Sequence, residues 1–87
     1  MDAIDEKTIP ANHGQVFEVN IVDEFAFSDV QESIMEIEGV KDVLFDDGVV
    51  PHEIIVHTDG AVNKEAVQAA VQRHGFSATP ESTFPLY

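Results

Sequence analysis

The sequence predicts one small α+β domain in the order strand, helix, strand, strand, helix, strand, and three observations carry this prediction. Apolar residues alternate with polar residues in short stretches, they recur at intervals of three and four residues in two longer stretches, and capping or turn-forming residues separate these stretches. The 87 residues suffice for a single domain with a modest core. A hydrophobic fraction of 44% is typical of a packed globule rather than a disordered chain.

The first predicted strand covers residues 16–22, where Phe17, Val19 and Ile21 alternate with other side chains. The residues before it, 1–14, mix charged side chains with proline and glycine and show no period. We therefore expect a flexible N-terminal leader, followed directly by the domain.

The first predicted helix follows a short connection over residues 23–27. Ser28 and Gln31 have the spacing of a capping box, in which each side chain bonds to the backbone of the other residue. Gly39 is placed to end the helix. The apolar stripe of this helix consists of Val30, Ile34 and Ile37.

Two further strands are predicted over residues 40–45 and 53–57, with the turn signal Asp47-Gly48 between them. They form a hairpin. Because residues 49–51 lengthen the connection, we do not expect a two-residue turn.

The second predicted helix begins after Asn63, a residue that is favoured at the N-cap. Gly75 fits the position just beyond its C-terminus, and Phe76 can pack back on the last turn as in a Schellman ending. The apolar stripe consists of Val67, Ala70 and Val71.

A short last strand over residues 76–79 is predicted to stop at Pro80, which has no N–H to donate to a sheet. This places the domain at residues 15–79 and leaves residues 80–87 as a C-terminal tail. The order of elements is that of the ferredoxin-like fold, a four-stranded antiparallel sheet with two helices on one face.

Three segments resemble the heavy-metal-associated (HMA) family, which includes small copper chaperones. Residues 34–43 (Ile-Met-Glu-Ile-Glu-Gly-Val-Lys-Asp-Val) resemble the family's first helix exit, residues 54–56 (Ile-Ile-Val) its third strand, and residues 69–78 (Ala-Ala-Val-Gln-Arg-His-Gly-Phe-Ser-Ala) its ending. The three segments occur in the family's order along the chain. The resemblance implies the ferredoxin-like fold already expected from the order of elements.

The chain departs from that family where the family binds metal. Members carry Met-x-Cys-x-x-Cys after the first strand, and its thiolates hold soft metals such as Cu(I). Here the corresponding residues 22–27 read Val-Asp-Glu-Phe-Ala-Phe, and the chain contains no cysteine. We therefore expect no Cu(I) thiolate site and no cofactor.

The charge excludes several classes of partner. Seventeen acidic against four basic residues give a formal net charge of −13, which repels nucleic acids and anionic membranes. A protein partner with a basic surface is the expectation.

The first residues lack the pattern of a signal peptide and no apolar run could span a membrane, so we expect a cytoplasmic protein. A halophilic source is a further hypothesis, which the folded fraction measured against salt concentration tests.

An alternative interpretation keeps metal handling through carboxylate and histidine ligands, for Zn(II) or another divalent cation. In the predicted topology, three connections meet at one end of the domain. His52 and His57 are expected on opposite faces of a strand, so the two histidines would not form one metal site. The candidate ligands at this end are Asp23, Glu24, Asp46, Asp47, His52 and His74.

Phe25 and Phe27 lie in the connection that meets partner proteins in the HMA family. We expect one of these rings in the core and the other as a candidate partner contact. An enzyme is not expected, since no nucleophile, base and orienting group occur together. Acylphosphatases share the fold but need an arginine in the first loop, and the one arginine here is Arg73. The sequence therefore favours a non-catalytic HMA-like interaction module, with a small-ligand regulatory domain as a more distant alternative.

Overall fold

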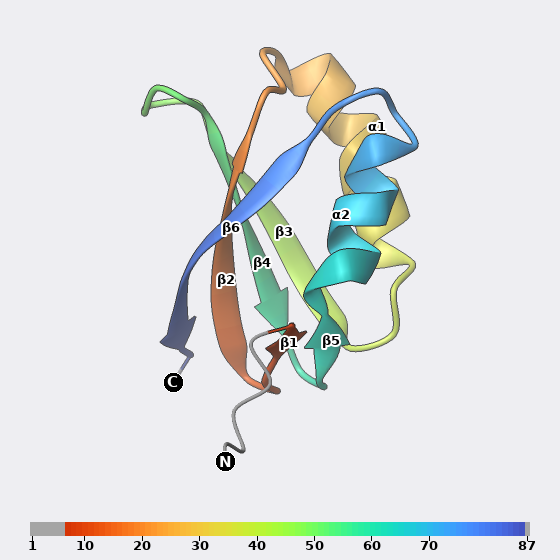
Figure 1. Cartoon of the computed structure of the whole chain (residues 1–87), viewed down its shortest axis with the longest axis vertical. Helices are drawn as coiled ribbons and strands as arrows, with labels where there is room; N and C mark the ends of the chain where they lie inside the picture. The colour runs from red at the N-terminus through yellow and green to blue at the C-terminus, as the bar shows by residue number, and fades with distance from the viewer. Residues whose placement is uncertain (1–6, 87) are drawn as a thin grey trace.

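The computed structural model describes residues 7–86 and is an α+β fold with two helices, a four-stranded antiparallel sheet and a two-stranded antiparallel sheet. The larger sheet has the strand order β3-β4-β2-β6, and both helices cover one of its faces (Figure 1). This arrangement is compatible with the predicted ferredoxin-like fold. The elements are β1 (Thr8–Ile9), β2 (His13–Val19), α1 (Glu24–Met35), β3 (Val40–Asp46), β4 (Glu53–Thr58), β5 (Val62–Asn63), α2 (Lys64–Gln72) and β6 (Ala78–Pro85).

The core lies between the helices and the covered face of the sheet. Alternate residues of the central strands point into it, as the period of two predicts, and the stripes of both helices meet them. The predicted stripe residue Ile37 lies beyond α1 and is only partly buried against the core. The fully buried apolar residues of the large sheet and the helices are Phe17, Val30, Ile34, Val43, Ile54, Val56, Val67, Ala70 and Val71.

Helix α1 begins and ends earlier than the sequence predicts. Asp23 is the N-cap, and its Oδ1 accepts a hydrogen bond of 2.8 Å from the Ala26 N–H. The predicted capping box at Ser28 is wrong. The Asp23 carboxylate caps the helix about one turn earlier, so Ser28 lies inside the helix. The helix ends at Met35, and Gly39, with φ of 98°, lies in the turn that leads into β3.

The predicted hairpin and second helix are confirmed, with small shifts of their ends. Strands β3 and β4 each run one residue further than predicted, whereas β2 begins and ends three residues earlier. Asn63 caps α2 by accepting a 2.8 Å hydrogen bond from the Glu65 N–H. At the other end, the Phe76 N–H donates to the Val71 carbonyl oxygen at 3.4 Å, as expected of a Schellman ending.

The N-terminal segment is not a flexible leader up to residue 14. Strand β1 pairs with β5, and the Ile9 side chain is fully buried in the core. The expectation failed because a two-residue strand shows no period in the sequence. Residues 1–6 of the predicted leader lie outside the described residues.

The C-terminal segment also belongs to the sheet. Strand β6 continues through Pro80 to Pro85 and pairs with β2 from Val19↔Ala78 to His13↔Pro85. The prediction that Pro80 ends the strand is wrong, because β6 is an edge strand and tolerates a residue without an N–H. The Phe84 ring covers Gly14 so closely that a Cβ there would lie 2.4 Å from a ring carbon.

Within residues 7–86, neither helix has the length and apolar content needed to cross a membrane. The connections β2–α1, β3–β4 and α2–β6 lie at one end of the domain, as predicted (Figure 1). We call this end the loop end. The two-stranded sheet of β1 and β5 lies at the opposite end.

Candidate functional site

The most exposed large apolar side chains of the described residues gather at the loop end. Val22, Phe25 and Val50 are 72%, 88% and 92% exposed, and Val49 beside them is 38% exposed. Val22 and Val50 line a common hollow, although they come from different connections. We call these four residues the loop-end patch. Exposed apolar side chains that gather at one end of a domain, as Val22 and Val50 do around their common hollow, are typical of a site that binds another molecule.

The local structure explains why these side chains face outward. Val22 stands between the fully buried Ile21 and the N-cap Asp23, so the chain turns into α1 and directs the valine away from the core. The Nδ1 of His52 lies 2.9 Å from the Ile21 carbonyl oxygen, which joins the β3–β4 connection to the β2–α1 connection. This contact holds Val50 and Val22 on the same side of the domain.

The two phenylalanines of the β2–α1 region have different environments. Phe27 is only 9% exposed, and its ring stacks on Phe45 with a centroid distance of 4.9 Å and an interplanar angle of 16°. Phe25 is two residues earlier on the same helix and therefore points away from the core. The prediction that one ring is core is confirmed, and Phe25 is the one left for partner contact.

Three of the candidate metal ligands serve local structure. Asp23 caps α1, and Asp46 accepts a hydrogen bond of 2.9 Å from the Gly48 N–H in the hairpin connection. His52 packs edge-on against Phe45 with a centroid distance of 5.5 Å, on the helix side of the sheet. His57 contacts Phe84 instead, on the uncovered face, so the two histidines lie on opposite faces as predicted.

The other three candidates are Glu24, Asp47 and His74. Glu24 is in the first turn of α1, and Asp47 is exposed in the hairpin connection. The Nε2 of His74 lies 2.7 Å from Ser33 Oγ, alongside the second half of α1. Within residues 7–86, no three His, Asp or Glu side chains are placed to hold a metal ion together.

Carboxylates also form a row across the uncovered face of the sheet. Glu53 pairs with Asp46 on one side and Glu18 on the other, and Glu81 lies beside them on β6. A hydrogen bond with Glu53 raises the pKa of Glu81, and slight desolvation and the charge of Glu53 act in the same direction. The surface of this face is therefore acidic, like the loop end.

The valines of the loop-end patch were not among the candidate site residues predicted from the sequence. A usable signal was present, because Val49 and Val50 are an apolar pair between Gly48 and Pro51, in a segment that belongs to neither strand. In comparisons with known proteins, no family model and no curated protein matches the chain.

Proposed function

We propose that this chain is a non-catalytic interaction module of the HMA-like type, in which the loop end docks a partner protein. One observation carries the proposal: the three most exposed large apolar side chains of the described residues lie at the same end of the domain, the end where the HMA family presents its metal-binding cysteines. The strand order and the position of both helices on one face support a ferredoxin-like fold for the module. The cytoplasmic location expected from the sequence belongs to the same proposal.

The chemistry of the loop end specifies the kind of partner. Removing a valine or phenylalanine side chain from water stabilises a complex by about 1.5–3 kcal/mol, so the loop-end patch supplies the driving force. Asp23, Glu24 and Asp47 border the patch and are exposed. A partner surface with an apolar centre and a rim of Lys or Arg complements this arrangement, and association is expected to slow as salt rises.

Site-specific photo-crosslinking tests the proposal. A photoreactive phenylalanine analogue at position 25 is expected to capture one protein from the source cells, and the same analogue at position 50 is expected to capture the same protein. Met35 is the matched control, because it is also an exposed apolar residue of α1 but lies at the other end of the helix. Binding of the purified partner is then measured with Phe25→Asp and Met35→Asp.

The proposal expects Phe25→Asp to weaken binding at least about tenfold, since an apolar contact is replaced by a desolvated charge. Equal weakening by Met35→Asp, or equal crosslinking from both ends of α1, would refute it.

An NMR titration with Zn(II) examines the divalent-ion alternative. Saturable shifts confined to the six candidate ligands of the loop end would favour that alternative over the proposal.

A further inference from the structure

Strand β3 is one edge of the four-stranded sheet, and its outer side faces no other strand of the described chain. In an antiparallel ladder, successive residues direct their backbone N–H and C=O alternately to each side. The backbone of Val43 points outward, because both its polar groups bond to side chains rather than to β4. By the same alternation, the N–H and C=O of Phe45 also lie on this outer side.

Two side chains occupy the outer backbone groups of Val43. The Gln31 amide donates a hydrogen bond of 2.8 Å to the Val43 carbonyl oxygen, and Asp42 Oδ1 accepts a hydrogen bond of 2.8 Å from the Val43 N–H. Gln31 is half-buried and Asp42 is exposed, so neither side chain is locked in the core. An incoming strand offers the same donor and acceptor from its own backbone and can therefore replace them.

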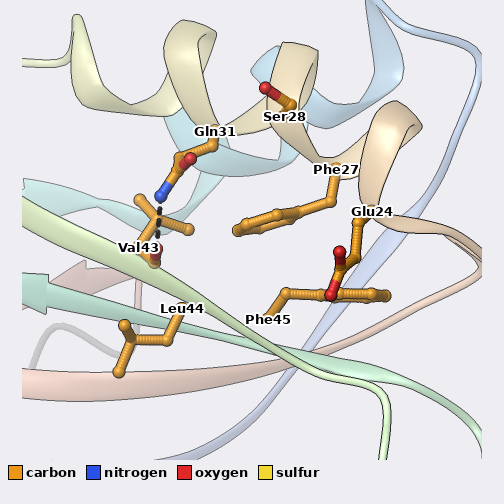
Figure 2. A pocket seen from close by; sticks show the side chains of 7 residues that line it. All are labelled: Glu24, Phe27, Ser28, Gln31, Val43, Leu44 and Phe45. Carbon is orange, nitrogen blue, oxygen red and sulfur yellow. Dashed lines mark hydrogen bonds between the residues drawn. The ribbon is translucent and has the colours of Figure 1, made fainter.

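An open groove runs beside this edge, between α1 and β3. Figure 2 shows the Phe27 and Phe45 rings forming its floor, with Gln31 reaching across from α1 to Val43. Glu24 stands at one end of the groove. The groove is next to the outer backbone groups of β3, so an added strand would place alternate side chains against the two aromatic rings.

The other edge of the sheet does not offer the same opportunity. Val19 donates its N–H to the His52 carbonyl, so Val19 and, by alternation, Phe17 direct their backbones away from β6. Pro80 pairs with Phe17, and its nitrogen therefore lies on the outer side of β6. A proline there offers no donor to an incoming strand.

We propose that the β3 edge and the α1–β3 groove bind an extended basic segment of a partner protein as an added fifth strand. Its apolar side chains enter the groove. Its Lys or Arg side chains lie on the uncovered face, beside Asp42 and Asp46, which point away from the helices. A second copy of this chain is not the occupant, because it would bring another charge of −13 and its own acidic edge.

An NMR titration with a short blocked peptide, in which Lys alternates with Val, tests this inference. The backbone amides of Val43 and Phe45 and the side-chain amide of Gln31 are expected to shift saturably, and the Phe45 amide to exchange more slowly with solvent. The matched control is the same peptide with N-methyl groups on alternate amides, which keeps its charge but removes the strand hydrogen bonds. It is expected to bind at least about tenfold more weakly.

A pair of protein variants makes the test specific for this edge. Gln31→Met frees the Val43 carbonyl for the peptide and is expected to tighten binding about fivefold. Gln68→Met is the control, because Gln68 makes the equivalent bond to Ala78 on β6, and it is expected to leave the affinity unchanged. The inference is overturned if both peptides bind equally, if the shifts lie elsewhere on the acidic surface, if no saturable shift occurs, or if sedimentation shows that the chain pairs with itself through β3.

Discussion

At both edges of the sheet, a glutamine side chain from the covering helix bonds to an outward-facing backbone carbonyl. The edges differ in whether the strand also contains proline. On β3, the Gln31 side chain of the covering helix donates to the Val43 carbonyl at 2.8 Å; on β6, the Gln68 side chain of the other helix donates to the Ala78 carbonyl at 2.9 Å. Only β6 also contains proline, at positions 80 and 85. A side-chain amide can be displaced by an incoming strand, whereas Pro80 and Pro85 have no N–H to offer at their positions and make the β6 edge a poorer template for strand addition.

The two edges are also attached to the domain differently. Strand β3 is supported from the core side by the stack of Phe27 on Phe45, which is largely buried. Strand β6 extends past the core, and its last residues are exposed. It is held by polar contacts with β2, including the hydrogen bond from Thr83 Oγ1 to the fully buried Gln15. Core packing of an aromatic pair therefore supports the middle of β3, whereas the far end of β6 is held by contacts with β2 outside the core, including the Phe84 ring over Gly14.

The largest expected effect comes from removing the support of the β3 edge. Phe27→Ala leaves a cavity beneath Phe45 and is expected to lower the free energy of unfolding by about 3–5 kcal/mol, measured by urea denaturation. Phe25→Ala is the control, because this ring is exposed and its loss should change stability by less than about 0.5 kcal/mol. Similar losses in the two variants would contradict the assignment of Phe27 to the core.

The corresponding change on the β6 edge is expected to be smaller. Thr83→Val keeps the shape of the side chain but leaves the buried Gln15 amide oxygen without its donor, at a cost of about 1–3 kcal/mol. Thr79→Val, the same substitution at an exposed position of the same strand, is expected to have little effect. Amide hydrogen exchange should localise the loss to the end of β6; equal losses in both variants would argue against the Gln15 contact.

The two glutamine caps provide the most direct comparison of the edges. Gln31→Ala and Gln68→Ala each remove one hydrogen bond to an edge carbonyl, and each is expected to cost about 0.5–1.5 kcal/mol of stability in urea denaturation. Their effects on strand addition should differ, because Pro80 still blocks the β6 edge. If only the Gln68 variant gained peptide binding, the conclusion that β3 rather than β6 accepts an added strand would be wrong.

The smallest expected effect is electrostatic and concerns Glu81 of β6, which lies beside Glu53 and Glu18 on the uncovered face of the sheet. The pKa of Glu81 is raised above its ordinary value of 4.5, chiefly by the hydrogen bond with Glu53. The folded state therefore binds this proton more tightly than the unfolded state, so its contribution is present below the unfolded pKa and is lost as pH rises through the folded pKa. Glu81→Gln should flatten this part of the stability–pH profile, and a carboxyl NMR titration checks the pKa directly.

Helix α2 and the β3–β4 hairpin could be predicted from sequence because their signals are local. Asn63 acts through the amide two residues on, and the alternation of residues 53–57 reflects neighbours along the same strand. From the sequence, one of the rings of Phe25 and Phe27 was expected to be buried and the other exposed, but not which one. Once the helix began at Glu24, its geometry decided which ring met Phe45.

The ends of the domain and the candidate sites could not be predicted in the same way. Ile9 is buried only because a two-residue strand pairs with β5, far along the chain. Pro80 is tolerated because its strand lies at an edge and its nitrogen faces outward. Val22 and Val50 become neighbours through a connection made by His52. Each of these facts depends on contacts between distant segments, which no local pattern contains.

The sequence by itself determined the order of elements, the faces that enter the core, the strongly acidic surface and the absence of thiolate ligands, because these follow from composition and from periods of two and 3.6 residues. Only the tertiary structure decided which strands became edges and what closes them. A hydrogen bond such as that from Gln31 to Val43 joins residues from two elements, and its role depends on β3 having a partner on one side only.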